Sequence, residues 1–128
     1  MLLTAIRGDT STWTFKVLED GFARDLTSDL IRFTVKADAD DLDSEALIRL
    51  SSGTSGVTIA IPQSGSTKGE FDVTLLHADT VGFAKNLRAY WDVQIILSED
   101  GTPVTPFYGD IMFVGDITHN TGDVGTDT

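Results

Sequence analysis

The chain has 128 residues, the usual size of one domain, and its nine lysines and arginines against 20 aspartates and glutamates give a formal net charge of −11. Such a surface repels phosphate backbones and anionic membranes, so we expect no nucleic-acid or membrane partner; it favours a protein partner with basic patches or serves solubility alone. The chain has no cysteine, which excludes disulfides, thiolate metal sites and cysteine nucleophiles.

The first strong signals along the chain are two segments that alternate apolar and polar residues. In residues 12–17 the apolar positions are Trp13, Phe15 and Val17, and the same period-two pattern returns in residues 31–36. Threonine, valine and aromatic residues dominate both segments. This alternation is typical of half-buried β-strands.

The middle of the chain predicts three more strands. An acidic stretch at 38–45, which we expect to contain a turn, precedes a short strand at 47–50 and another at 57–61. A Gly/Ser-rich loop at 63–69 then leads into the alternating strand 71–75.

Helix is scarce in the sequence. Residues 77–84 predict one short helical turn, with Asp79 or Thr80 as its N-cap.

The last predicted elements form a hairpin. A strand at 90–97 is followed by Asp100-Gly101, which favours a type I′ turn because both central residues of that turn need positive φ. The return strand runs from about 106 to 114. Gly109 interrupts its apolar face and indicates either a bulge or a close approach of another backbone.

About seven strands at intervals of roughly ten residues predict an all-β sandwich or small barrel over residues 1–117. Residues 118–128 are polar and acidic, and we expect a flexible tail. We predict that seven aromatic side chains on inward strand phases form the core: Trp13, Phe15, Phe33, Phe71, Trp91, Phe107 and Phe113.

Several motifs in this order resemble the small immunoglobulin-like domains of tailed bacteriophages, including the N-terminal domain of the baseplate upper protein family. They are RGDT at 7–10, FTVK at 33–36, GEFDVTL at 69–75, ADT at 78–80 and YWDVQ at 90–94. The resemblance spans about residues 5–117. It implies an immunoglobulin-like antiparallel β-sandwich.

The resemblance also implies a function by assembly. We expect a structural component of a virion, in a baseplate, tail, neck or head surface, assembled in the host cytoplasm. Its partners would be other virion proteins, and the chain would form a homo-oligomer in a symmetric assembly. The alternative is a module that decorates a capsid or binds a carbohydrate or cell surface.

The N-terminal sequence agrees with assembly in the cytoplasm. Residues 1–7 lack the pattern of a signal peptide, and no apolar run approaches the roughly 20 residues of a membrane span. We expect the two ends of the chain to make docking contacts. Residues 1–6 would add a strand to a neighbour, and the residues after about 117 would become ordered on binding.

The sequence predicts no catalytic, cofactor-binding or metal-binding residue, no cofactor, and therefore no enzyme. Arg7-Gly8-Asp9 is interpreted as a turn rather than an integrin motif. His77 and His119 lack metal-ligand spacing. A combination of His77, Asp79 and a serine would need a geometry that sequence does not show.

The acidic stretch 38–45 is the densest cluster of carboxylates. Calcium prefers such oxygen ligands, but the stretch fails the EF-hand pattern, because Asp43 stands where that pattern needs glycine and Arg49 where it needs glutamate. A solvated loop is the favoured interpretation.

Tyr90 and Tyr108 fall on the opposite strand phase from their apolar neighbours. They are candidates for surface contacts, because interfaces favour tyrosine.

Overall fold

The alternating segments form strands in the computed structural model, which describes residues 1–84 and 86–115. All seven predicted strands are present: β2 (Ser11–Lys16), β5 (Leu30–Lys36), β6 (Ile48–Ser51), β7 (Val57–Ile59), β8 (Glu70–Leu75), β9 (Leu87–Ile96) and β10 (Pro103–Val114). Three further strands join them: β1 (Leu2–Ile6), β3 (Leu18–Glu19) and β4 (Phe22–Ala23). The remaining elements are η1 (Asp43–Glu45), η2 (Gly65–Thr67) and α1 (His77–Thr80).

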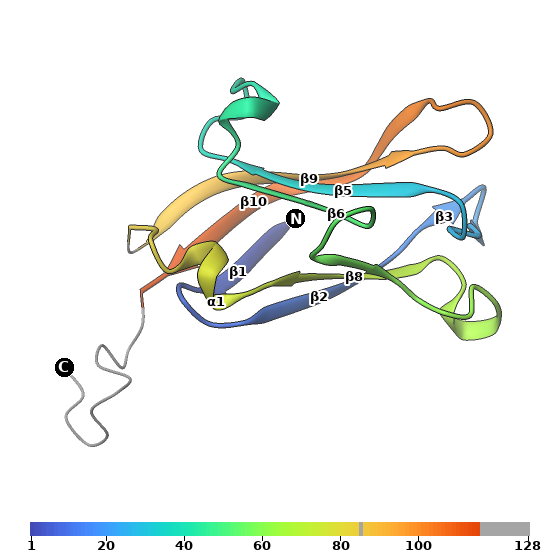
Figure 1. The fold of residues 1–128 in the computed structure, drawn as a ribbon, viewed down its shortest axis with the longest axis horizontal. Helices are drawn as coiled ribbons and strands as arrows, with labels where there is room; N and C mark the ends of the chain where they lie inside the picture. Colours follow the sequence, from blue (N-terminus) through green and yellow to red (C-terminus); the bar gives the residue numbers. More distant parts are fainter. Residues whose placement is uncertain (85, 116–128) are drawn as a thin grey trace, which may run out of the picture.

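The strands form two facing sheets (Figure 1). One has the order β1-β10-β9-β5-β6 and the other the order β2-β8-β7, with β3 and β4 as a separate hairpin. In chain order this places β2, β8 and β7 as strands B, E and D of an immunoglobulin domain, and β10, β9, β5 and β6 as G, F, C and C′. The fold is therefore an immunoglobulin-like β-sandwich, with eight strands in its two sheets rather than about seven.

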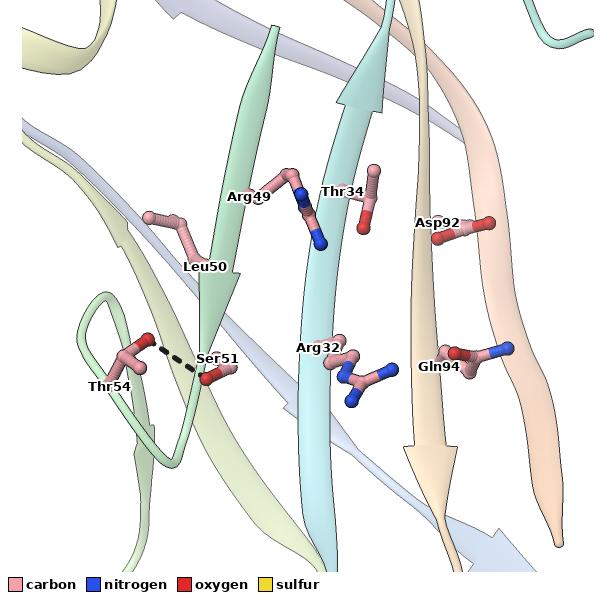
Figure 2. A pocket seen from close by; sticks show the side chains of 8 residues that line it. All are labelled: Arg32, Thr34, Arg49, Leu50, Ser51, Thr54, Asp92 and Gln94. Carbon is pink, nitrogen blue, oxygen red and sulfur yellow. Dashed lines mark hydrogen bonds between the residues drawn. The ribbon is translucent and has the colours of Figure 1, made fainter. Parts of the chain in front are cut away.

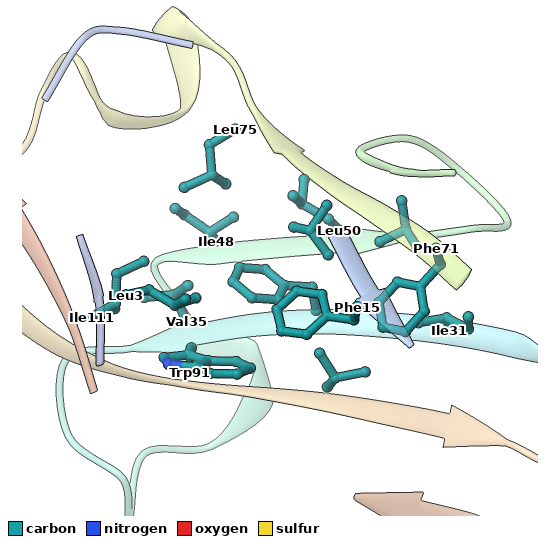
Figure 3. Packing of buried hydrophobic residues seen from close by; sticks show 14 of the residues in the cluster. Leu3, Phe15, Ile31, Val35, Ile48, Leu50, Phe71, Leu75, Trp91 and Ile111 are labelled. Atoms are coloured by element: carbon teal, nitrogen blue, oxygen red, sulfur yellow. The ribbon is translucent and has the colours of Figure 1, made fainter. Parts of the chain in front are cut away.

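The core between the sheets is aromatic, as the strand phases predict. The Phe15 ring from one sheet lies 5.3 Å from Phe71 and 5.6 Å from Trp91, and the Phe33 ring lies 5.8 Å from Trp91. Figure 3 shows Phe15, Phe71 and Trp91 pointing into this shared layer. Trp13 and Phe107 are partly buried at its border, so all seven predicted aromatic residues belong to the core or pack against it.

The two Asp-Gly pairs form different turns. Asp20 and Gly21 have φ values of 55° and 83° and connect β3 to β4 as a type I′ turn. At the predicted site only Gly101 has a positive φ, 74°. Its amide donates to the Leu97 carbonyl at 2.8 Å, which closes a longer loop. The predicted hairpin is confirmed, but the predicted type I′ turn there is wrong.

Residues 1–6 occupy their own sheet. β1 pairs in parallel with β10, and its inward residues Leu3 and Ala5 are buried. Residues 1–6 therefore pair within their own chain, which corrects the expectation that they add a strand to a neighbour. Gly109 of β10 is the close approach that its sequence context indicated, because a side-chain carbon there would collide with the Met1 carbonyl. The bulge of β10 lies between Val104 and Phe107.

The helical turn α1 is confirmed, but its cap differs from the prediction. Leu76 is the N-cap residue, and the Asp79 carboxylate accepts its amide at 2.7 Å. Thr80 is buried. The predicted tail, 118–128, lies outside the described residues. Within the described part of the chain, no helix has the length and hydropathy that a membrane span needs.

Candidate interaction face

The side of the five-stranded sheet that points away from the core is the candidate site, and we call it the outer face. Side chains alternate along a strand, so the burial of Phe33 and Val35 in β5 turns Arg32, Thr34 and Lys36 outward. The same alternation in β6, β9 and β10 adds Arg49, Ser51, Tyr90, Asp92, Gln94, Tyr108 and Asp110.

The strand register brings these side chains together from four strands. Thr34 lies opposite Arg49 on one side and opposite Asp92 on the other, and Asp92 in turn lies opposite Tyr108. The next row joins Tyr90 of β9 to Asp110 of β10. Residues directly opposite on one face are in contact distance, so each row runs continuously across the sheet.

Two adjoining hollows lie on the outer face. The first has a volume of about 390 Å³ and spans β6, β5 and β9 (Figure 2). The second has a volume of about 320 Å³ and extends over β9 and β10. Thr34 and Asp92 line both, so the two hollows meet at these residues.

The two hollows differ in chemistry. The first contains Arg32, Arg49, Ser51, Thr54 and Gln94. Neither arginine makes a hydrogen bond or ion pair with another residue in the described part of the chain. The first hollow therefore presents two guanidinium groups that have no acceptor among residues 1–84 and 86–115.

The second hollow combines the exposed tyrosines Tyr90 and Tyr108 with the charged residues Lys36, Asp92 and Asp110. Tyr90 and Tyr108 are 43% and 72% exposed, which confirms the outward position that their phase predicts. At its margin Arg88 donates to the Asp110 carboxylate, and this bond raises the pKa of Arg88. The charged groups Arg88 and Asp110 beside the tyrosines are therefore paired with each other.

The Arg7-Gly8-Asp9 string is a turn, as interpreted, and it is held against the segment that follows β8. The Arg7 guanidinium donates to the Phe83 carbonyl at 3.1 Å, and the Gly8 amide donates to the Thr80 hydroxyl at 2.8 Å. His77 Nδ1 lies 2.6 Å from the Gly8 carbonyl oxygen. Gly8 has a φ of 85°. These bonds give His77 and Thr80 a structural role.

Three carboxylates of the acidic stretch accept hydrogen bonds from amides of the same loop. Asp41 accepts from the Asp38 amide, Asp38 from the Asp40 amide, and Glu45 from the Leu42 amide. Among the side chains that the structure describes, no group of three histidines or acids could hold a metal ion. The side chain of Asp43 and all of His119 lie outside that description.

The arginine hollow was not predicted from the sequence. The alternation of apolar and polar residues in 31–36 and 47–50 does predict that Arg32 and Arg49 point outward. Their proximity depends on β5 and β6 being neighbours, which a single sequence does not reveal.

No family model matches the chain, and no curated protein matches it in sequence. Two solved structures with a similar fold are the NK cell receptor NKp44, a triggering partner in natural cytotoxicity, and the PmoD soluble domain from a Methylocystis species. NKp44 is 16% identical over 90% of this chain and 96% of its own, with a TM-score of 0.47. PmoD is 16% identical over 88% of this chain and 76% of its own, with a TM-score of 0.46. Both are likenesses of fold alone.

Proposed function

We propose that the chain is a structural component of a tailed-phage virion and acts by protein–protein assembly through its outer face. The virion part is supported by the sequence resemblance, whose motifs supply strands and turns of one sandwich. The observation that carries the assembly part is the exposure of Tyr90 and Tyr108 on a regular sheet face. Partners include other virion proteins and further copies of this chain in a symmetric array.

Burying these two tyrosines at an interface has a small cost in side-chain entropy and a large gain in contact area. A tyrosine has only two side-chain torsions, so ordering it at an interface costs little entropy while its ring covers a large area. Tyr90 lies on β9 between β10 and β5, and Tyr108 lies opposite Asp92 of β9, so strand pairing fixes both backbone positions before a partner arrives. Preorganisation of this kind raises affinity.

The virion part is tested by mass spectrometry of purified particles of the phage that encodes the chain, with heads and tails separated. We expect the chain in one fraction, at many copies per particle. Its absence from both fractions overturns this part of the proposal.

The assembly part is tested with the double variant Tyr90→Ser/Tyr108→Ser, in the full chain. Self-association and incorporation into particles, followed by sedimentation, should weaken at least tenfold, while the thermal midpoint stays within about 2 °C because both side chains are exposed. Phe22→Ser is the matched control, since Phe22 is 78% exposed on the β3–β4 hairpin. Unchanged association in the double variant, or an equal loss in the control, contradicts the outer face as the interface.

Carbohydrate binding is the alternative, and the exposed ring of Tyr108 favours it, because a sugar ring can pack against an open aromatic face. Under this alternative, a glycan array should show saturable binding that Tyr108→Ser abolishes. Glycan binding that survives Tyr108→Ser would show that the outer face is not the carbohydrate-binding site.

A further inference from the structure

We propose that the arginine half of the outer face binds a carboxylate-bearing extended segment of a partner protein. The arginine half consists of Arg32, Arg49 and the Ser51, Thr54 and Gln94 side chains around them. This inference rests on the proposed function and deepens it, because it names the chemistry of the partner at the same face.

The two arginines form one cationic site. Arg32 lies opposite Ser51, and Arg49 lies opposite Thr34, so the two arginines are diagonal neighbours on adjacent strands. Figure 2 shows the Arg49 side chain reaching toward β5 and the Arg32 side chain reaching toward Gln94. Both residues are exposed.

Their lack of an acceptor contrasts with the arginines elsewhere in the described chain. Arg24 contacts Glu19, Asp29 and Glu99 within 2.9 Å, and Arg88 contacts Asp110. The chain has 20 acidic and nine basic residues, so its carboxylates outnumber its cationic side chains. Within residues 1–84 and 86–115 these two adjacent guanidinium groups have no carboxylate partner, and we infer that a partner protein supplies it.

A carboxylate fits this site better than a row of phosphates. A guanidinium group presents a planar fork that pairs with both oxygens of a carboxylate. Asp92 lines the same hollow, and its charge limits the site to an isolated anionic group. The net charge of −11 opposes nucleic acid as a whole. At physiological salt the electrostatic field of a surface charge decays over about 8 Å. The two arginines, rather than the net charge of the chain, therefore determine which charged group binds at this site.

The shape of the face favours an extended segment of protein. The two hollows meet at Thr34 and Asp92 and together cross four strands, which at about 4.8 Å per strand is about 14 Å from β6 to β10. An extended chain of four or five residues, at about 3.3 Å each, spans that length. We infer acidic residues over β6 and β5 at one end, and an apolar or aromatic residue over Tyr90 and Tyr108 at the other. This local preference is opposite to the basic partner that the overall charge favours.

The test uses NMR of the ¹⁵N-labelled full chain with a capped hexapeptide, Glu-Glu-Ser-Thr-Tyr-Leu. We expect saturable shifts at the amides of Arg32, Arg49 and Gln94, which weaken between 50 and 300 mM salt. Arg32→Gln/Arg49→Gln should weaken binding at least tenfold. Lys16→Gln, which removes a cation from the other sheet, should leave it unchanged. A peptide with glutamine in place of both glutamates should bind at least tenfold more weakly.

Three results would overturn the inference: no saturable shifts, equal binding of the glutamine peptide, or equal binding by the arginine variant. Tighter binding of an oligothymidylate would also overturn it in favour of phosphate. The same variants in the sedimentation assay separate the two proposals. Failed peptide binding together with assembly that still depends on Tyr90 and Tyr108 removes this inference alone. Assembly that depends on neither tyrosine removes the assembly part of the proposed function.

Discussion

Asp29 is the charged side chain whose burial requires the most compensation among those the structure describes. Its side chain is 1% exposed, and Arg24 binds both of its oxygens, at 2.8 and 3.1 Å. The Ser98 amide adds a third bond at 3.0 Å. Arg24 also contacts Glu99, so this cluster links the segment before β5 to the loop between β9 and β10. Burying a carboxylate without such partners would cost several kcal/mol.

The Asp29 cluster predicts loss of stability in acid. Burial by itself raises the pKa of Asp29, but the bonds from Arg24 and Ser98 outweigh it, and the pKa lies below its ordinary value. The carboxyl group therefore stabilises the fold above its unfolded pKa of about 3.9, and this stabilisation is lost as the pH falls through the folded pKa. We expect the free energy of unfolding, measured in urea, to fall more steeply below about pH 4 in the wild type than in Asp29→Asn.

The same substitution has a cost at neutral pH. Asp29→Asn should lose roughly 3 kcal/mol at pH 7, because Arg24 stays largely buried without its main partner. Asp9→Asn, at an exposed carboxylate, is the matched control and should change stability by less than about 0.5 kcal/mol. Parallel pH profiles for the wild type and Asp29→Asn would show that the cluster does not govern acid unfolding.

At the scale of elements, β1 depends on one glycine of its partner strand. The Met1 carbonyl accepts from the Asp110 amide at 3.1 Å and from the Trp91 indole at 3.3 Å. Both bonds need Met1 to pass directly over Gly109, where no side chain fits. Parallel pairing of β1 with β10 therefore requires glycine at this position.

Gly109→Ala should displace the start of β1 from β10. We expect the hydrogen-exchange protection of the Leu3 and Ala5 amides to fall at least tenfold, with a loss of about 1–3 kcal/mol in global stability from overpacking. Gly82→Ala is the matched control, because a side-chain carbon at Gly82 has no neighbour within 4 Å. Unchanged protection in Gly109→Ala would mean that β1 is not held by this approach.

The elements also show which features a sequence can predict. Period-two alternation locates seven strands and gives the correct outward phase for Tyr90 and Tyr108, since both depend only on local residues. Turn type did not follow from the dipeptide. Asp20-Gly21 forms the two-residue turn and Asp100-Gly101 does not, because the length of a loop depends on where its flanking strands pair.

Contacts between distant segments are harder to predict. Residues 2–6 would fit a strand in any sheet, and the partner strand of this segment, β10, lies at the other end of the chain. In the same way, nothing local to Arg32 or Arg49 indicates that they share a hollow. Strand order decides both questions, and several strand orders would satisfy the same alternation.

At the scale of the whole molecule, negative charge exceeds what ion pairing can compensate. The chain carries a net charge of −11, and Arg24 and Arg88 form ion pairs with four of its carboxylates. In the acidic loop 38–45, the carboxylates of Asp38, Asp41 and Glu45 accept from backbone amides and stay negatively charged without a cation in these bonds. Repulsion of this kind destabilises a compact state.

Salt should therefore stabilise the fold. Raising NaCl from 10 to 150 mM shortens the screening length from about 30 to about 8 Å, which weakens the long-range repulsion more than the short Arg24 contacts. We expect the thermal midpoint to rise by about 3 °C, equivalent to roughly 1 kcal/mol in a chain of this size. Asp38→Asn/Asp40→Asn/Glu45→Gln removes three negative charges while keeping an acceptor oxygen at each position, so it should show a smaller rise. A midpoint that falls with salt would mean that the ion pairs outweigh the repulsion.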